Sequence, residues 1–318
     1  MDHTILVTGA AGFAGSHLLD LLEGGPARLV PWRRPAEPFP PGRTGDDLPW
    51  MSVELLDRDA VAAAVAEVRP DAVFHLAGAA HVGHAWDRTR DTLAANVLAT
   101  HHLLVALRRA GLRPRVLITG SALVYRPSAT ALHEDDPLGP SSPYGVSKLA
   151  QELLGRRAAG DEGLPVIVTR PFNHVGPRQH PSFFTSSFAR QIALIETGGA
   201  GAEMTVGNLE ARRDLTDVRD TVRAYRALIE RGRPGEVYNV CSGRAYRVGD
   251  ILDRLLAKAR VPISVRSDAA LHRPNDTPLV AGSWQRIHRE TGWEPVIPIE
   301  RTLDDLLAYW RAAIAAGA

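Results

Sequence analysis

Short apolar runs and amphipathic stretches alternate along the first half of the chain. Thr4 to Thr8 is a β-branched, apolar run that ends in glycines, and a helical pattern follows from Phe13 to Leu22. This order predicts a strand, a tight turn and a helix. Further strands are expected at Arg28–Trp32, Ser52–Leu56, Asp71–Ala77, Arg115–Ser121 and Leu164–Pro171, and further helices at Asp59–Val68, Thr89–Ala110 and Tyr144–Ala159.

Two of these strands, at 71–77 and 115–121, are almost continuously apolar. Such strands are typical of the centre of a parallel sheet, where both faces are buried. Because strands alternate with helices, the sequence predicts right-handed βαβ units and an α/β fold with a Rossmann-type, doubly wound parallel sheet.

The regular alternation ends after Pro171, where segments rich in Gly, Pro and Arg interrupt shorter elements. This predicts a smaller C-terminal lobe folded against the main domain. Residues 217–230 and 238–240 are expected to return to the main sheet. The predicted division is 1–171, with returning segments near 214–245, for the main domain, and 172–213 with 246–318 for the lobe.

Composition and charge exclude several classes of protein. Apolar residues make up 45% and charged residues 23%, as in ordinary globular proteins, and a net charge of +1 gives no reason to expect nucleic acid or an anionic membrane as partner. With Cys241 alone, neither an intrachain disulfide nor a cysteine-based metal site is expected. The start of the chain lacks a signal-peptide pattern and no apolar run is long enough to cross a bilayer, so we expect a cytoplasmic protein.

A glycine-rich turn joins the first strand to the first helix. Gly9 permits a sharp turn, Gly12 lets a pyrophosphate approach the backbone, and Gly15 lets the helix pack closely on the strand. The helix that begins at Phe13 offers free N–H groups and a positive dipole end to phosphates. A glycine triplet alone can be a simple loop, but its position between a strand and a helix indicates a dinucleotide site.

The residues after the second strand bear on the choice of nicotinamide. Arg33 and Arg34 stand where NAD sites place an acidic residue, and two guanidinium groups favour a 2′-phosphate. NADP(H) is therefore preferred and NAD(H) stays possible; the alternative is a solvated basic pair. The Pro-rich segment 35–45 that follows is taken as a surface loop without a function. Further cofactor contacts are expected where the third and fourth strands end, at Glu54, Leu55, Leu76 and Ala77.

Two nearby residues have structural interpretations. Asp57 can equally cap the next helix, and His75 is interpreted as a buried structural histidine.

The candidate catalytic residues are Ser121, Tyr144 and Lys148. Tyr144 and Lys148 are four apart, on one face of a helix. A phenol has a pKa near ~10, which a neighbouring ammonium and a positively charged nicotinamide would lower, so that Tyr144 can exchange a proton with a carbonyl oxygen. Ser121 ends the preceding strand and is expected to hydrogen-bond the reacting oxygen; alternatively, it only caps the turn.

Here the chain resembles a known family. The glycine turn, Ser121, the run Tyr144-Gly-Val-Ser-Lys148 and the run Arg170-Pro-Phe-Asn173 together resemble the extended short-chain dehydrogenases/reductases. The resemblance covers nearly the full length and implies that the smaller lobe binds a nucleotide-diphosphate sugar. It also implies that Lys148 grips the nicotinamide ribose and that a homodimer forms through the helices around 89–110 and 144–159.

The second half resembles the GDP-mannose branch of that family, which contains GDP-mannose 4,6-dehydratases and GDP-4-keto-6-deoxy-D-mannose reductases. The resemblance lies in Arg170–Gln179, Ser187–Gln191 and Val206–Asp214, and Asn208–Asp220 with Val237–Gly243 looks closest to the reductases. It implies a GDP-linked or other NDP-linked sugar as partner. Expected substrate contacts are Asn173, Arg190, Asn208, Arg213, Arg273 and Asp276, although at least one of these arginines is expected to make a structural ion pair.

Position 123 bears on the reaction. Dehydratases of this family carry an acid two residues before the tyrosine that matches Tyr125, and Leu123 stands there instead. The resemblance therefore implies NADPH-dependent reduction of the C4 keto group of GDP-4-keto-6-deoxy-D-mannose, giving GDP-D-rhamnose or its C4 epimer. The alternatives are an NDP-sugar 4-epimerase with tightly bound NAD, a 4,6-dehydratase and a non-catalytic cofactor-sensing protein. Arg126 replaces the family's usual glycine, so the local turn can differ.

Overall fold

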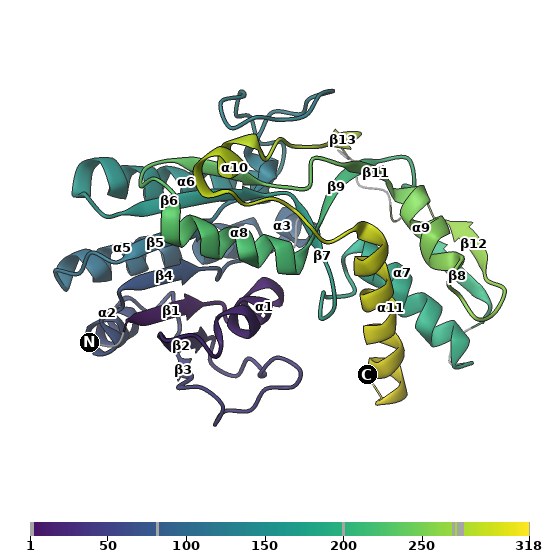
Figure 1. Ribbon diagram of the computed structural model, residues 1–318, viewed down its shortest axis with the longest axis horizontal. Coiled ribbons are helices and arrows are strands. Elements are labelled where there is room, and N and C mark those ends of the chain that lie inside the picture. The colour runs from purple at the N-terminus through teal and green to yellow at the C-terminus, as the bar shows by residue number, and fades with distance from the viewer. Residues whose placement is uncertain (1–2, 81–82, 199–200, 269–270, 272–276, 318) are drawn as a thin grey trace.

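The computed structural model describes residues 3–80, 83–198, 201–268, 271 and 277–317. Its main layer is a seven-stranded sheet in the order β10-β6-β5-β4-β1-β2-β3, in which every neighbouring pair is parallel (Figure 1). The strands are β1 (Thr4–Thr8), β2 (Arg28–Arg33), β3 (Met51–Ser52), β4 (Ala72–His75), β5 (Arg115–Thr119), β6 (Val166–Pro171) and β10 (Val237–Val240). The strand order reverses between β1 and β4, which confirms the predicted doubly wound sheet.

Side chains of β1 enter two separate cores because successive strand residues point to opposite faces. Ile5 and Val7 belong to one core and Leu6 to the other. One face is covered by α1 (Phe13–Leu22), α8 (Val218–Arg231) and α10 (Gln285–Thr291), and the other by α2 (Arg58–Val68), α5 (Ala99–Arg109) and α6 (Pro143–Glu162). No described helix has both the length and the apolar character that a membrane crossing needs.

The helix predicted over 89–110 is interrupted. It consists of α4 (Thr89–Leu93), a π-helical turn η1 (Ala94–Leu98) and α5, and the short α3 (His84–Asp87) precedes it. Within the π turn, the Asn96 side chain accepts a hydrogen bond from the Ala79 N–H at 2.8 Å and donates to Ser147 Oγ at 2.8 Å. The contact with Ser147 joins the π turn to α6, and such turns are frequent at functional sites.

The strand predicted over 52–56 was wrong, because β3 ends at Ser52. The Glu54 carboxylate accepts from the Leu56 N–H at 3.0 Å and the Glu54 carbonyl from the Asp57 N–H at 3.0 Å, so the chain turns directly into α2. The Asp57 side chain caps that helix, as the alternative interpretation had it. The strands predicted through Ala77 and Ser121 also end two residues earlier.

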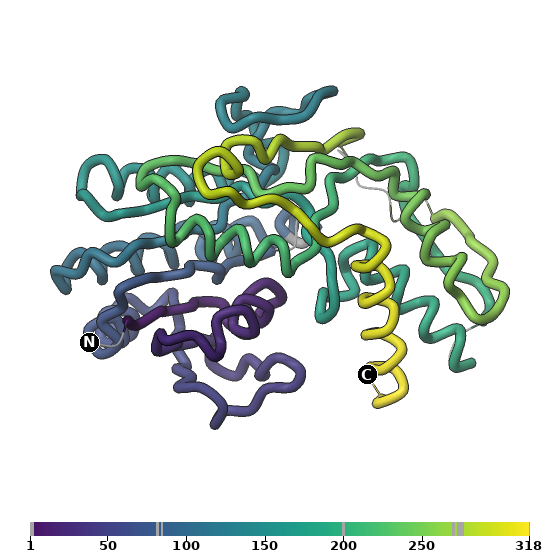
Figure 2. Tube along the Cα trace, viewed as in Figure 1, coloured from purple at the N-terminus to yellow at the C-terminus, as the bar shows by residue number. Residues whose placement is uncertain are grey.

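The remaining elements form a smaller packed unit beside the sheet. Its strands are β7 (Asn173–Val175), β9 (Arg212–Asp217), β11 (Ala245–Arg247) and β13 (Leu279–Val280), together with the pair β8 (Glu203–Val206) and β12 (Ser264–Ser267). Its helices are α7 (Phe184–Glu196), α9 (Val248–Leu256) and α11 (Ile299–Ala315), which share one core and lie away from the sheet in Figures 1 and 2.

The division of the chain at the predicted boundaries stays a prediction, with one observation added. Helix α10 falls within the range 246–318, yet Ile287 and Trp293 are buried in the core of the main sheet. The Trp293 indole N–H also donates to the Asp220 carbonyl of α8 at 3.0 Å. We therefore expect residues 285–293 to fold with the main domain.

Candidate active site

Tyr144 and Lys148 lie on α6, and Ser121 lies just beyond the end of β5. Helix α6 begins where it does because Ser142 caps it, its Oγ accepting from the Gly145 N–H at 3.1 Å. The three predicted catalytic side chains are all buried, with 7% of Ser121, 9% of Tyr144 and 5% of Lys148 exposed. The structure thus buries all three side chains at the same end of the sheet.

The first turn of α6 packs against η2 (Ala122–Val124), a 3-10 turn. An added Cβ on Gly145 would lie 2.5 Å from the Leu123 carbonyl oxygen and 2.8 Å from Pro140 Cβ, so any side chain there would push α6 away. The Ser121 Oγ accepts from the Leu123 N–H at 3.1 Å and also hydrogen-bonds the Tyr144 side chain. Ser121 therefore caps the turn and still stands beside the phenol.

Burial controls the acidity of Tyr144. It raises the pKa of the phenol to about 12, although the hydrogen bond with Ser121 acts in the opposite direction. Lys148 Nζ lies 6.0 Å from the centre of the Tyr144 ring. The lowering of this pKa by the ammonium together with a bound nicotinamide stays a prediction. The phenol is consequently protonated at neutral pH, the form in which it can donate.

Lys148 is held by two acceptors. Its Nζ donates to the Thr119 carbonyl at 2.9 Å and to Gln151 Oε1 at 2.9 Å. Burial lowers the pKa of this amine to about 7. Lys148 is therefore close to the balance between its charged and neutral forms near neutral pH.

The glycine turn lies where β1 and β4 end. Gly9 has φ +67°, and an added Cβ would lie 2.6 Å from the Ala77 nitrogen, so only glycine fits. The backbone N–H of Leu76 donates to the Thr8 carbonyl at 3.2 Å and that of Ala77 to Thr8 Oγ1 at 3.3 Å. The structure thus brings Gly9, Leu76 and Ala77 to one edge of the sheet.

Helix α1 presents its N-terminus at the same edge. Gly12 is its N-cap and provides no side-chain cap, and Gly15 is buried in the helix. The backbone N–H groups of this first turn suit a phosphate, so the turn fits a dinucleotide. Phe13, the first helical residue, stacks its ring on that of His174 at 5.6 Å and 11°. The predicted cofactor residue Phe13 therefore also ties α1 to β7.

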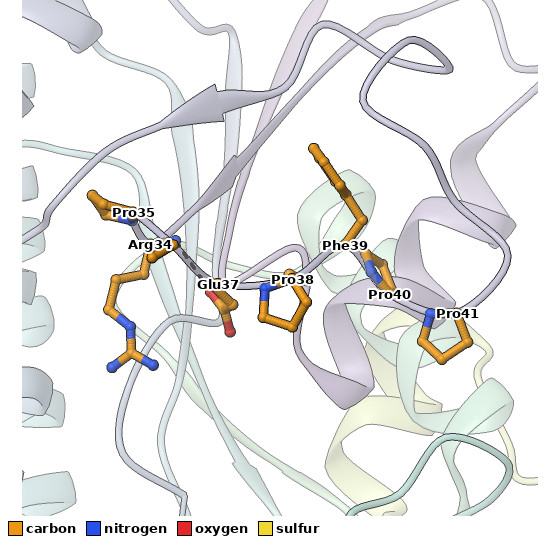
Figure 3. A pocket seen from close by; sticks show the side chains of 9 residues that line it. Arg34, Pro35, Glu37, Pro38, Phe39, Pro40 and Pro41 are labelled. Atoms are coloured by element: carbon orange, nitrogen blue, oxygen red, sulfur yellow. Dashed lines mark hydrogen bonds between the residues drawn. The ribbon is translucent and has the colours of Figure 1, made fainter. Parts of the chain in front are cut away.

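A pocket of about 570 Å³ lies beside the glycine turn (Figure 3). Its lining comprises Ala11, Arg34, Pro35, Ala36, Glu37, Pro38, Phe39, Pro40 and Pro41. The Arg34 backbone N–H donates to the Glu37 carboxylate at 3.1 Å, while its guanidinium extends away from the chain in Figure 3. The Pro-rich segment, to which the sequence analysis gave no function, is thus a wall of this pocket. The position of this segment directly after Arg33 and Arg34 is the feature of the sequence that could have indicated this role.

Arg33 and Arg34, which the sequence analysis interpreted together, have different surroundings. Arg33 Nη1 donates to the Glu37 carbonyl at 2.5 Å, and its Cζ lies 4.5 Å from the centre of the Phe39 ring. Arg33 therefore braces the loop, and Arg34 lines the pocket.

The other predicted adenine contacts lie on the turn after β3. Glu54 and Leu55 are half-buried there, and the Leu55 carbonyl accepts a hydrogen bond from His102 Nδ1 at 2.9 Å. The Glu54 carboxylate is already engaged by the turn itself. Their role toward a cofactor stays a prediction.

Asn173 and Arg213, two predicted substrate contacts, lie on neighbouring strands. Asn173 is half-buried at the start of β7 and pairs with Leu215 of β9. Arg213 Nη1 donates to the carbonyl of Arg212 at 2.9 Å and to that of Thr277 at 2.7 Å. Arg213 thereby fastens β9 to the segment before β13.

The remaining predicted substrate residues lie elsewhere in the smaller unit. Arg190, on α7, has its Cζ 5.7 Å from the centre of the Trp310 ring. The Asn208 side chain accepts from the Glu210 N–H at 2.9 Å. Arg273 and Asp276 lie outside the described residues. Among the described residues, no contact given for Arg190 or Asn208 involves the catalytic set.

Arg170, which the sequence singled out within a motif, makes a buried ion pair. Its Nε and Nη2 donate to the two Glu152 carboxylate oxygens at 2.8 and 2.6 Å, and the exposed fractions of the two side chains are 2% and 0%. Its Cζ also lies 4.6 Å from the centre of the Tyr125 ring. Arg170 therefore joins β6 to α6 and orients the helix that carries Tyr144.

Asp214 is a second buried carboxylate, and it was not among the site residues predicted from the sequence. Asp214 of β9 accepts hydrogen bonds from the Ser242 N–H at 2.8 Å, the Ser242 hydroxyl at 2.7 Å and the Gly243 N–H at 2.9 Å. Burial raises the pKa of Asp214 to about 6 although these bonds act to lower it. Asp214 fixes the loop after β10 against β9.

Comparison with known proteins places these features in a family. The chain matches the GDP-mannose 4,6 dehydratase family model over residues 6–306. It is 37% identical to the GDP-6-deoxy-D-mannose reductase of Pseudomonas aeruginosa over 317 residues, 99% of each chain, and 28% identical to the UDP-glucose 4-epimerase of Bacillus subtilis, with 96% of each chain covered. The solved structure of RMD from Pseudomonas aeruginosa complexed with NADPH superposes with a TM-score of 0.86 and 34% identity, covering 98% of this chain and 99% of that chain. The chain therefore belongs to the GDP-mannose 4,6 dehydratase family, within the extended short-chain dehydrogenases/reductases.

Proposed function

We propose that this protein is an NADPH-dependent reductase of the C4 keto group of GDP-4-keto-6-deoxy-D-mannose, with GDP-D-rhamnose or its C4 epimer as product. The observation that carries the proposal is the buried cluster of Ser121, Tyr144 and Lys148 at the strand ends. The relative that is 37% identical bears the name of such a reductase, and RMD was solved with NADPH.

The residues that would hold NADPH follow from the shape of the site. The backbone around Gly9, Gly12 and Phe13 suits the pyrophosphate, and Arg34 suits the 2′-phosphate. Lys148 would bind the nicotinamide ribose. We retain Gly15, Arg33, Glu54, Leu55, Leu76 and Ala77 as supporting contacts along the strand ends. When bound, NADPH supplies a hydride to the carbonyl carbon.

The protein's side chains stabilise and neutralise the negative charge that develops on the carbonyl oxygen during the reduction. Tyr144, protonated at neutral pH, donates its proton to that oxygen as negative charge develops there, and the product is an alcohol. The Ser121 hydroxyl donates a hydrogen bond to the same oxygen. Lys148, one helical turn away, favours the tyrosinate that remains.

Leu123 argues against a dehydratase despite the family's name. It lies half-buried in η2, and its backbone N–H donates to the Ser121 Oγ that caps this turn. An apolar side chain there offers no proton for the loss of water from C5 and C6.

The smaller unit would bind the GDP moiety. We propose contacts from Asn173, Arg190, Asn208 and Arg213, and the same role for Arg273 and Asp276, which rests on the resemblance alone.

An assay with GDP-4-keto-6-deoxy-D-mannose and NADPH tests the function. We expect nicotinamide absorbance to fall in step with sugar reduction, and NMR of the product to identify its C4 configuration. The rival function is a 4-epimerase, which the similarity to UDP-glucose 4-epimerases favours. Protein purified with NAD and active without added NADPH would support that rival instead.

Arg34 provides a test of cofactor preference. Replacing Arg34 with Ala is expected to raise the NADPH dissociation constant by about 10- to 100-fold, because a charge-assisted hydrogen bond to the 2′-phosphate is lost. NADH, which lacks that phosphate, should bind with little change. Fluorescence titration with both cofactors measures the effect, and the exposed Arg126, replaced with Ala, is the control. Equal weakening of NADH and NADPH would rule out this role for Arg34.

The same family resemblance supports a homodimer. Large apolar side chains are exposed on α3, α4, η1 and α6, namely Trp86, Leu93, Leu98, Val146 and Leu153. Helices α4 and α6 pack side by side, so these residues share one face. We propose that a second copy of the chain covers this face.

Leu153 tests the dimer. It is 52% exposed, and its replacement with Glu is expected to convert dimers to monomers at micromolar concentration, because a carboxylate would be buried without a partner. Light scattering coupled to size exclusion measures the mass. Val261, 37% exposed and outside this face, is the matched position for the same substitution. A monomeric wild-type protein would contradict the proposal.

A further inference from the structure

A chain of buried hydrogen bonds runs from Lys148 to the first strand. Lys148 Nζ donates to Gln151 Oε1 at 2.9 Å, and Gln151 Nε2 donates to Thr100 Oγ1 at 2.8 Å. His75 joins Thr100 through Nε2 at 2.8 Å and Thr8 through Nδ1 at 2.8 Å. Lys148 is 5% exposed and the other four side chains are fully buried. The chain links α6, α5, β4 and β1.

Each member of this chain has one orientation. The Thr100 hydroxyl has a single proton and donates it to the Asn96 carbonyl at 2.7 Å, so its oxygen accepts from both other neighbours. Gln151 must therefore present its N–H to Thr100 and its carbonyl oxygen to the ammonium. His75 must carry its proton on Nε2, and Nδ1 then accepts from the Thr8 hydroxyl.

Among the described residues, the Lys148 ammonium has acceptors for two of its three N–H groups. It has three N–H donors, of which the Thr119 carbonyl and Gln151 Oε1 each take one. Nζ lies 3.5 Å from the position that a Cβ on Gly78 would occupy, next to Leu76 and Ala77 at the strand ends. Two fixed acceptors on a tetrahedral group fix the third N–H as well.

We propose that Gln151 is a positioning residue that aims the third N–H of Lys148 at the cofactor ribose and, as a neutral acceptor, leaves the ammonium without a carboxylate partner. This inference rests on the proposed function, because it specifies how the same site binds and responds to pH. Thr100 and His75 act through Gln151 by fixing which end of its amide faces the lysine.

The electrostatic surroundings agree with a lysine that has no anionic partner. Tyr144 and His75 are the titratable groups that face it among the described residues. Burial, followed by the charge of Lys148, lowers the pKa of His75 to about 3, so this imidazole is neutral. Burial keeps Tyr144 protonated. With neutral neighbours, the lysine loses its proton as pH rises through a pKa of about 7.

Substitution by Glu tests the neutral character of Gln151. In Gln151→Glu, a carboxylate of the same size contacts the ammonium and raises the pKa of Lys148. NADPH titrated by fluorescence across the pH range should bind less tightly to the wild type as the lysine deprotonates. We expect the midpoint of this loss to move up by about 1 pH unit or more in the variant. Gln191→Glu, the same change on α7 of the smaller unit, should leave the midpoint in place.

Substitution by Leu tests positioning. Gln151→Leu removes the acceptor and should raise the NADPH dissociation constant about tenfold, with a melting temperature close to that of the wild type. Thr100→Val, which frees the amide to turn, should give a smaller rise. If Gln151→Leu does not fold, the isosteric Glu variant decides alone.

These readouts separate the inference from the proposed function, because cofactor titration needs no sugar. A wild type that binds NADPH but fails to reduce the keto sugar would overturn the proposed function. The effect of the Gln151 variants on NADPH binding would then still decide the inference about Gln151. An unchanged midpoint in Gln151→Glu, or a wild type that binds no NADPH, overturns the inference.

Discussion

Replacing Tyr144 with Phe is expected to lower kcat by about 10²–10⁴-fold, because the carbonyl oxygen then loses its proton donor. The phenol lies beside Ser121, and its removal leaves the glycine turn and Lys148 untouched. We therefore expect the variant to bind NADPH with nearly the wild-type dissociation constant. Steady-state assays and fluorescence titration measure the two quantities.

Tyr246, half-buried on β11, is the matched control, and Tyr246→Phe should keep full activity. A Tyr144→Phe variant that turns over at the wild-type rate would show that another group protonates the oxygen. A variant with weak NADPH binding would instead indicate a structural role for the hydroxyl.

Replacing Arg170 with Met is expected to destabilise the fold by about 3–5 kcal/mol. The Glu152 carboxylate, fully buried, would lose its bidentate partner and stay in a region of low dielectric. Arg156 lies 4.0 Å from the same carboxylate, but its side chain is half-exposed and makes no second bond of that kind. Urea unfolding followed by circular dichroism measures the change in free energy.

The double variant Glu152→Met with Arg170→Met is the control for this prediction. It removes both charges, so it should recover much of the lost stability. If the single Arg170 variant loses less than about 1 kcal/mol, water reaches Glu152 and the ion pair is not buried in solution.

The sequence predicted the sheet because buried parallel strands and amphipathic helices have distinct periodicities. It placed β1 and α1 with little error for that reason. No signal in the sequence indicated the π turn at 94–98, whose Asn96 side chain contacts Ser147, 51 positions away. The early end of β3 depends on a local side-chain bond of Glu54 that competes with the strand.

That Ser121, Tyr144 and Lys148 lie in one buried region could be predicted from the sequence, but the acidity of the Tyr144 phenol could not. The charge of Lys148 is visible in the sequence, whereas the burial that raises the pKa of Tyr144 is a property of the packed fold. Arg33 and Arg34 were likewise indistinguishable until the loop folded, because Phe39 and the Glu37 carbonyl decide which guanidinium is engaged. Gln151 gave no signal, since its importance comes entirely from its tertiary neighbours.

The proline-rich wall of the pocket beside the glycine turn has a thermodynamic consequence. Pro35, Pro38, Pro40 and Pro41 each restrict φ, so this segment samples few conformations even before a ligand arrives. If the proposed dinucleotide docks there, it has little backbone to order, and the entropy lost on association is correspondingly small. Rigidity in a loop of this kind therefore serves tight binding in the same way as an added contact.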